Sequence, residues 1–228
     1  MKATTIISLL LTGIGATVVA TSAPASATTF GFNNITGGDT VGDAFAPNFS
    51  FDVTDNGSGT VLFKFLNNAS STQALKQVAF SVDSAASGIL SNIAVNVGNS
   101  GTVLFQNNAQ NLSQSNNISG WDGTTFGADT KGGNNNAVQS GESLGITFTG
   151  NYNTVLSAIN AGTLKVGIHV GSLPGGYSDS YVNSVPTTPP SKSVPEPSTL
   201  FGIGLVFGLA SLSKANNDKK WKQKQFNA

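Results

Sequence analysis

Short segments in which apolar and polar residues alternate recur along the middle of this chain of 228 residues. Residues 49–53 read FSFDV, residues 61–65 read VLFKF, and the sequence DNGSG at residues 55–59 separates them. A period of two places apolar side chains on one face of a β-strand and polar side chains on the other. Because the intervening sequence is typical of a tight turn, this region predicts an antiparallel hairpin.

Further segments with the same alternation extend the prediction to an all-β domain. The additional expected strands are residues 78–82, 89–97, 102–106, 144–149, 164–170 and 181–185. One helix is expected at residues 154–161, with Asn153 or Thr154 as its N-cap and Gly162 at its end. About eight strands joined by Gly- and Asn-rich turns predict a single β-sandwich, jelly-roll-like in arrangement. We assign this domain to residues 28–185, which is long enough to bury one core.

The composition excludes several kinds of chemistry. Charged residues make up only 10% of the chain, against about a quarter in an average protein. The chain has no cysteine, which excludes a disulfide framework and thiolate catalysis. Residues 28–185 contain nine acids and four lysines, so the domain carries a net negative charge. Binding of nucleic acid needs clustered cations, and we therefore expect no nucleic-acid partner.

The N-terminal 27 residues are typical of a secretory signal peptide. Lys2 supplies a positive charge, residues 6–20 are apolar, and Ala25 and Ala27 flank Ser26 in an A-x-A cleavage sequence. This pattern predicts cleavage after Ala27 by signal peptidase, so that the mature, exported protein begins at Thr28. The alternative interpretation is a buried first helix of the domain.

The C-terminal region combines a spacer, an apolar run and a basic end. Residues 186–193 read PTTPPSKS, which is typical of an extended linker. Residues 198–213 carry no charge and would form a helix of about 24 Å, short of the roughly 30 Å of a bilayer core. We expect a short transmembrane sorting helix here, although a buried C-terminal helix of the domain is the alternative. The lysines that follow are typical of a cytoplasmic end, namely Lys214, Lys219, Lys220, Lys222 and Lys224.

A rigid tetrapeptide precedes the apolar run. Its residues are Val194, Pro195, Glu196 and Pro197, and the two prolines favour an extended backbone. Together with the apolar run and the basic end, this order resembles the PEP-CTERM sorting signal of Gram-negative bacteria, here residues 194–228. Residues 162–186 also resemble the last part of an ectodomain found in exported PEP-CTERM proteins. The resemblance implies processing by an exosortase, a membrane-embedded cysteine transpeptidase, and a link to extracellular polysaccharide and biofilm.

Catalytic residues are not evident in the domain. His169 is the only histidine, and no G-x-S-x-G sequence places a nucleophile beside it. Asp52 and Asp55 are close in sequence, but their positions are typical of a strand edge and a turn rather than of a glycosidase pair. We therefore predict that the protein is not an enzyme, with a secreted hydrolase as a less favoured alternative.

Metal and cofactor sites are also weakly indicated. Zinc is poorly supported because the chain has one histidine and no cysteine. Asp39 with Asp43, and Asp129 with residues 134–136, are loose candidates for calcium, whose ligands are oxygens. Turn formation by Asp and Asn explains both groups equally well. We assign no metal site and no cofactor, and keep calcium as an alternative.

Carbohydrate binding is the main alternative to a purely structural role. Trp121 lies in a polar segment and would stack on a sugar ring, with help from Tyr177. The interpretation that we favour for Trp121 is a buried anchor for its loop. The sequence therefore predicts an exported, non-enzymatic protein of the cell surface or extracellular matrix, associated with exopolysaccharide. The alternative is a carbohydrate-binding module of the same matrix.

Overall fold

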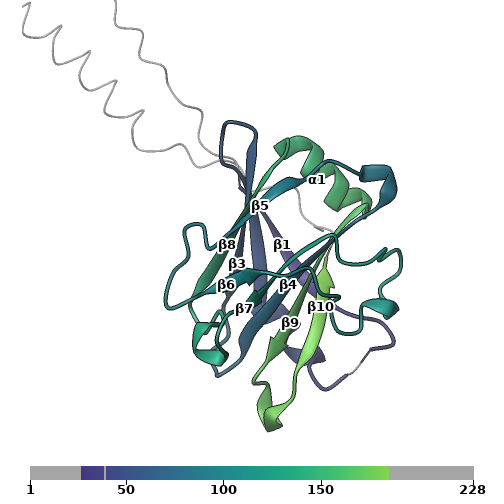
Figure 1. Cartoon of the computed structure of the whole chain (residues 1–228). Coiled ribbons are helices and arrows are strands. Elements are labelled where there is room, and N and C mark those ends of the chain that lie inside the picture. The colour runs from purple at the N-terminus through teal and green to yellow at the C-terminus, as the bar shows by residue number, and fades with distance from the viewer. Residues whose placement is uncertain (1–26, 39, 185–228) are drawn as a thin grey trace, which may run out of the picture.

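The structure is a computed structural model that describes residues 27–38 and 40–184, and this part folds into ten β-strands, one α-helix and short 3₁₀ turns (Figure 1). The strands are β1 (Ala27–Asn34), β2 (Phe49–Asp55), β3 (Thr60–Asn67), β4 (Ala74–Val82), β5 (Ser91–Val95), β6 (Phe105–Asn107), β7 (Phe126–Thr130), β8 (Ser143–Thr149), β9 (Leu164–Gly171) and β10 (Asp179–Asn183). The helices are α1 (Tyr152–Ala161) and the 3₁₀ turns η1 (Asp43–Asn48), η2 (Ser84–Ala86), η3 (Ser115–Asn117), η4 (Asn134–Asn136) and η5 (Pro174–Gly176).

All ten strands belong to one antiparallel sheet with the order β5-β8-β3-β2-β1-β10-β9-β4-β7-β6. The predicted jelly-roll-like β-sandwich is therefore wrong, although the all-β class is correct. The reason lies in β1, which pairs with β2 through Ala27 to Gly31 and with β10 through Phe32 to Asn34. One strand thus joins two groups of strands that a sandwich would keep apart.

The sheet curls until its two edge strands approach each other, which gives a nearly closed, barrel-like shape. A side chain links the two edges. Asn96, the residue after β5, accepts a hydrogen bond from the backbone N–H of Phe105 in β6 and donates one to its carbonyl, both at 2.8 Å. The amide of Asn96 therefore replaces a peptide group of a neighbouring strand.

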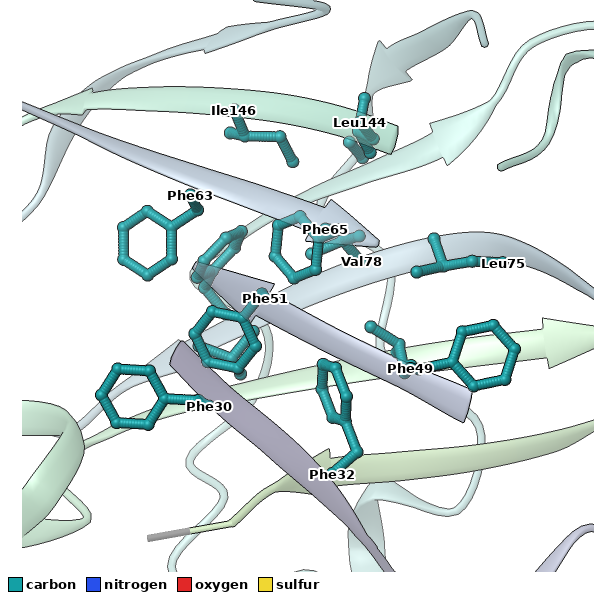
Figure 2. Packing of buried hydrophobic residues seen from close by; sticks show 14 of the residues in the cluster. Phe30, Phe32, Phe49, Phe51, Phe63, Phe65, Leu75, Val78, Leu144 and Ile146 are labelled. Atoms are coloured by element: carbon teal, nitrogen blue, oxygen red, sulfur yellow. The ribbon is translucent and has the colours of Figure 1, made fainter. Parts of the chain in front are cut away.

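Phenylalanines fill the interior of the curled sheet (Figure 2). Phe51 lies among them, with its ring centroid 5.1 Å from Phe30 and 5.5 Å from Phe65. On the other side Phe80 meets Phe63 and Phe148 edge-on, at 5.1 and 4.9 Å. Because these side chains come from five strands, β1, β2, β3, β4 and β8, their burial holds the two parts of the sheet together.

The helix α1 covers one end of the sheet and begins earlier than expected. Asn151 is its N-cap, since its side chain accepts a hydrogen bond from the backbone of Thr154 at 3.0 Å. The prediction of Asn153 or Thr154 as the cap is wrong, whereas Gly162 ends the helix as predicted, with a left-handed φ of 72°. Val155 and Ile159 lie on the buried face of the helix.

The hairpin predicted around residues 55–59 is confirmed, since β2 and β3 pair in antiparallel register and Asn56 N–H donates to Thr60 O at 3.0 Å. The alternation did not reveal β1 or β7. The predicted sorting helix at residues 198–213 lies outside the described residues, as do the signal peptide before Ala27 and the linker. Among residues 27–38 and 40–184, no helix has the length and hydrophobicity to cross a membrane.

Candidate functional site

The outer face of β7, β4, β9 and β10 carries two parallel rows of residues. The strand register places Gly127, Ala79, Gly167 and Val182 side by side in one row. Two residues further along each strand, the second row contains Asp129, Gln77, His169 and Ser180. The first row is small and apolar and the second is polar, so the same face offers both packing and hydrogen bonds.

The segment between β6 and β7, residues 108–125, packs over the apolar row, and we call it the covering loop. Leu112 and Ile118 of this loop are buried against Ala79, and Trp121 packs beside them. A Cβ atom placed on Gly167 would lie 2.4 Å from Leu112 and 3.2 Å from the Trp121 ring. The absence of a side chain at residue 167 therefore allows the indole to lie directly on the sheet.

Trp121 is half-buried, and its indole N–H is buried without a hydrogen-bond partner among the described residues. Its position agrees with the anchoring role that we favoured from the sequence. Tyr177 is 55% exposed and lies in the connection between β9 and β10. Trp121 lies over Gly167, whereas Tyr177 lies beyond Gly171, the last residue of β9. Four residues of a strand span about 13 Å, so at least this distance separates the positions of the two aromatic residues along β9. The structure does not bring Trp121 and Tyr177 into one sugar-binding site.

His169 and Ser180 form a hydrogen bond across β9 and β10. The imidazole Nδ1 lies 2.9 Å from the Ser180 hydroxyl, because the two residues are direct partners in the strand register. Burial lowers the pKa of His169, and the nearby charge of Lys76 lowers it further, whereas Asp179 opposes this change. Ser180 is only 1% exposed, so a substrate has no approach to its hydroxyl.

Asp179 is 2% exposed and serves the covering loop rather than the histidine. Its Oδ1 atom accepts hydrogen bonds from Gln114 Nε2 at 3.0 Å and from the backbone N–H of Ser180 at 2.8 Å. The neighbouring Tyr181 donates its hydroxyl to the carbonyl of Gly42 at 2.7 Å, and burial raises its pKa. Serine, histidine and aspartate are thus close together, but the carboxylate does not orient the imidazole as a catalytic triad requires.

Asp129, at the β7 end of the polar row, has a shifted pKa. Burial raises the pKa of its carboxyl group, and a hydrogen bond from the Asn108 amide opposes the shift. The second carboxylate oxygen is buried without a partner among the described residues. No hydrogen bond of the described part joins Asp129 to residues 134–136, and no cluster of three His, Cys, Asp or Glu occurs there. The other calcium candidate is Asp39 with Asp43. Asp43 is the first residue of η1, whereas Asp39 lies outside the described residues.

Asp52 and Asp55 serve local structure. Asp52 lies opposite Lys64 in the β2–β3 register and accepts a hydrogen bond from the Thr29 hydroxyl at 2.6 Å. Asp55 accepts one from the backbone N–H of Gly57 at 2.9 Å and so stabilises the hairpin turn. Residues three apart on a strand point to opposite faces, which explains why the two carboxylates do not form a pair.

A polar pocket that the sequence did not indicate opens at the end of the sheet away from α1. It has a volume of about 410 Å³, and we call it the loop-end pocket. Its lining residues are Thr72, Thr102, Asn134, Asn135, Gln139 and Ser172. They come from four separate connections, β3–β4, β5–β6, β7–β8 and β9–β10. No local sequence pattern reports such a site, because only the strand order brings these loops together.

Hydrogen bonds between the loops give the loop-end pocket its shape. Thr72 donates its hydroxyl to the carbonyl of Ser172, and Asn134 donates its amide to the Ser172 hydroxyl, both at 3.3 Å. Thr102 donates to the carbonyl of Asn135 at 3.0 Å. Side chains of the pocket therefore tie all four connections together. The β3–β4 and β7–β8 connections are bonded to Ser172 in the β9–β10 connection, and the β5–β6 connection is bonded to β7–β8.

The remaining functional predictions concern the two ends of the chain. Of the predicted cleavage site, Ala27 and Thr28 are the first residues of β1 and lie opposite Thr54 and Val53 of β2, whereas Ala25 lies outside the described residues. The tetrapeptide Val194 to Pro197 and the lysines from Lys214 onward also lie outside them. Comparisons of the chain with protein-family models, with curated proteins and with solved structures find no match.

Proposed function

We propose that this chain is an exported, non-enzymatic protein of the cell surface or extracellular matrix, which an exosortase sorts and processes. The observation that carries the proposal is the order of three sequence elements at the C-terminus. The tetrapeptide Val194-Pro195-Glu196-Pro197 comes first, an uncharged run follows, and a lysine-rich end completes the signal. The A-x-A sequence at Ala25 to Ala27 supports export by the general secretory route.

In this proposal, the sorting signal keeps the precursor at the inner membrane until the exosortase cleaves it. Signal peptidase and exosortase are then the processing partners, and the domain is delivered to a matrix rich in exopolysaccharide. The non-enzymatic part of the proposal is supported by His169. The serine beside this histidine is buried, and the nearby aspartate bonds to a loop, so these residues act in packing the sheet.

The test is the intact mass of the protein in separated cell fractions of its host. We expect a species that begins at Thr28, ends near Pro197 and is recovered outside the inner membrane. Replacing Pro195 and Pro197 by alanine should leave the precursor uncleaved, whereas Thr187→Ala in the linker should be processed normally. A native protein that stays in the inner membrane with a mass that includes Trp221 would contradict the proposal.

A carbohydrate-binding module of the same matrix is the second candidate function. The loop-end pocket favours it, because its six lining side chains are the hydroxyl and amide groups that bind sugars through hydrogen bonds. Trp121, which the sequence offers for sugar stacking, lies against Gly167 and packs with Leu112 and Ile118.

A further inference from the structure

We propose that the loop-end pocket binds one residue of an uncharged polysaccharide. The inference rests on the proposed function for the source of this polysaccharide, the matrix into which the protein is delivered. The site itself is inferred from the chemistry of its walls, from their rigidity and from an exposed aromatic ring on one of the loops that form it.

The walls of the loop-end pocket consist only of hydroxyl and amide side chains. Each of these groups both donates and accepts hydrogen bonds, which matches the hydroxyls around a sugar ring. None of the lining residues is charged, so the pocket offers no ionic partner to a phosphate or a carboxylate. Its volume of about 410 Å³ lies within the roughly 300–1,000 Å³ of small-ligand pockets.

Part of the hydrogen-bonding capacity of the pocket is available to a ligand. Asn135 is exposed, and no hydrogen bond of its side-chain amide occurs within the described residues. Its backbone carbonyl is held by Thr102, so the residue is fixed at the wall while its amide stays available. Gln139 uses its amide N–H on Asn134, and its side-chain oxygen remains as an acceptor.

The loops around the pocket are held in place from below. The Glu142 carboxylate accepts the backbone N–H of Thr102 at 3.0 Å and that of Gln139 at 2.9 Å, and so ties two walls together. The buried Asn67 donates to the carbonyls of Gln73 and Val138, at 2.7 and 2.9 Å. Because the walls are fixed before a ligand arrives, little ordering entropy is lost on binding.

Ser172 has a backbone conformation that its residue type rarely adopts. Its φ of 56° lies in the left-handed region that favours glycine, yet the position carries a side chain whose hydroxyl lines the pocket. Left-handed conformations of non-glycine residues cost stability and often accompany functional sites. The hydroxyl bonds to Asn134, which links the strained residue directly to the opposite wall.

Tyr177 provides an aromatic face on the connection that carries Ser172. The turn is closed by a hydrogen bond from Leu173 N–H to Tyr177 O at 3.1 Å, and the ring lies close to Gly175. The side chain is 55% exposed, which is unusual for a large aromatic group without a partner surface. In our proposal, this ring stacks on the C–H face of the sugar residue next to the one in the pocket.

The test measures binding of neutral and acidic oligosaccharides to the protein purified from its host, by isothermal titration calorimetry. The probes are hexamers of neutral glucans and mannans, the neutral fraction of the host's own matrix polysaccharide, and oligogalacturonate as the acidic counterpart. We expect saturable binding of at least one neutral probe and much weaker binding of oligogalacturonate. Asn135→Ala and Tyr177→Ala should each weaken binding about three-fold to ten-fold, because each removes one ligand contact.

Asn160→Ala is the matched control, since Asn160 has an exposed amide on α1, at the opposite end of the molecule. This variant should bind the probe as the native protein does. The exposure of Asn135 and Tyr177 makes both variants compatible with the fold. Three results would each overturn the inference: no binding of any neutral probe, binding unchanged in both variants, or equal binding of the acidic probe. These results leave the sorting proposal untouched, because that proposal is tested by mass and cell fraction alone.

Discussion

The two halves of the sheet present their outer faces in opposite ways. The outer face of β2 and β3 is open, and on it Asp52 lies opposite Lys64 in the strand register. The outer face of β4 and β9 lies beneath the covering loop, with Ala79 and Gly167 fully buried. The contrast shows that the covering loop turns half of an ordinary two-sided sheet into a second, smaller core.

The largest difference between the halves is expected when the covering loop loses its anchor. Trp121→Ala removes the half-buried indole from Gly167 and should cost about 2–3 kcal/mol of unfolding free energy. Thermal unfolding should show a fall in Tm of roughly 5–10 °C. Lys64→Ala on the open half is the control and should change stability by less than about 0.5 kcal/mol. Equal losses in both variants would show that the loop adds no core of its own.

A smaller difference in stability is expected between two glycine-to-alanine variants, one beneath the covering loop and one away from it. Gly167→Ala places a Cβ 2.4 Å from Leu112, so the covering loop must shift, and we expect a loss of about 1–2 kcal/mol. Gly31→Ala on β1 is the counterpart, because its Cβ meets only the Ser184 hydroxyl, at 3.4 Å. Denaturant unfolding should show that Gly31→Ala is nearly neutral. Comparable destabilisation by the two variants would contradict a close-packed loop.

The smallest difference concerns pH, and it arises from His169 on the covered half. Burial lowers the pKa of this imidazole from its ordinary 6.5, so the unfolded chain binds a proton more readily than the folded one. The stability that comes from the neutral imidazole is complete above about pH 6.5 and decreases as the pH falls toward the folded-state pKa.

His169→Gln tests this assignment, because glutamine retains a polar partner for Ser180 and does not titrate. The fall in Tm between about pH 7.5 and pH 5 should be smaller in the variant than in the native protein. Asp52→Asn on the open half should leave the same pH difference unchanged in this range. An identical pH profile for His169→Gln and the native protein would exclude His169 as the source.

The comparison also shows what the sequence can and cannot predict. On the open half the alternation is regular, so the β2–β3 hairpin is evident from residues 49–65. On the covered half the consecutive residues Gly127 and Ala128 of β7 are both buried, so the alternation that identifies a half-exposed strand is lost there. The strand order depends on β1, whose two ends pair with different partners, and no property of residues 27–34 alone reports that division.

The arrangement of the site residues also depends on how segments that are distant in sequence pair. That Ser180 lies opposite His169 depends on the length of the β9–β10 connection, which sets the register and is not read from the composition of either strand. The loop-end pocket depends on four connections meeting, which is a consequence of the strand order. Trp121, in contrast, packs in the covering loop as a half-buried residue, a position that its large aromatic side chain in a polar segment already suggests.

The amide of Asn96 has a consequence for how copies of this protein meet one another. A free strand edge is a template on which a second chain can add its own strand, and the hazard grows with concentration. Asn96 occupies the backbone N–H and carbonyl of Phe105, the groups through which β6 would recruit a neighbour. This edge of the sheet is thereby closed, at Phe105, to a strand from a second copy of the protein.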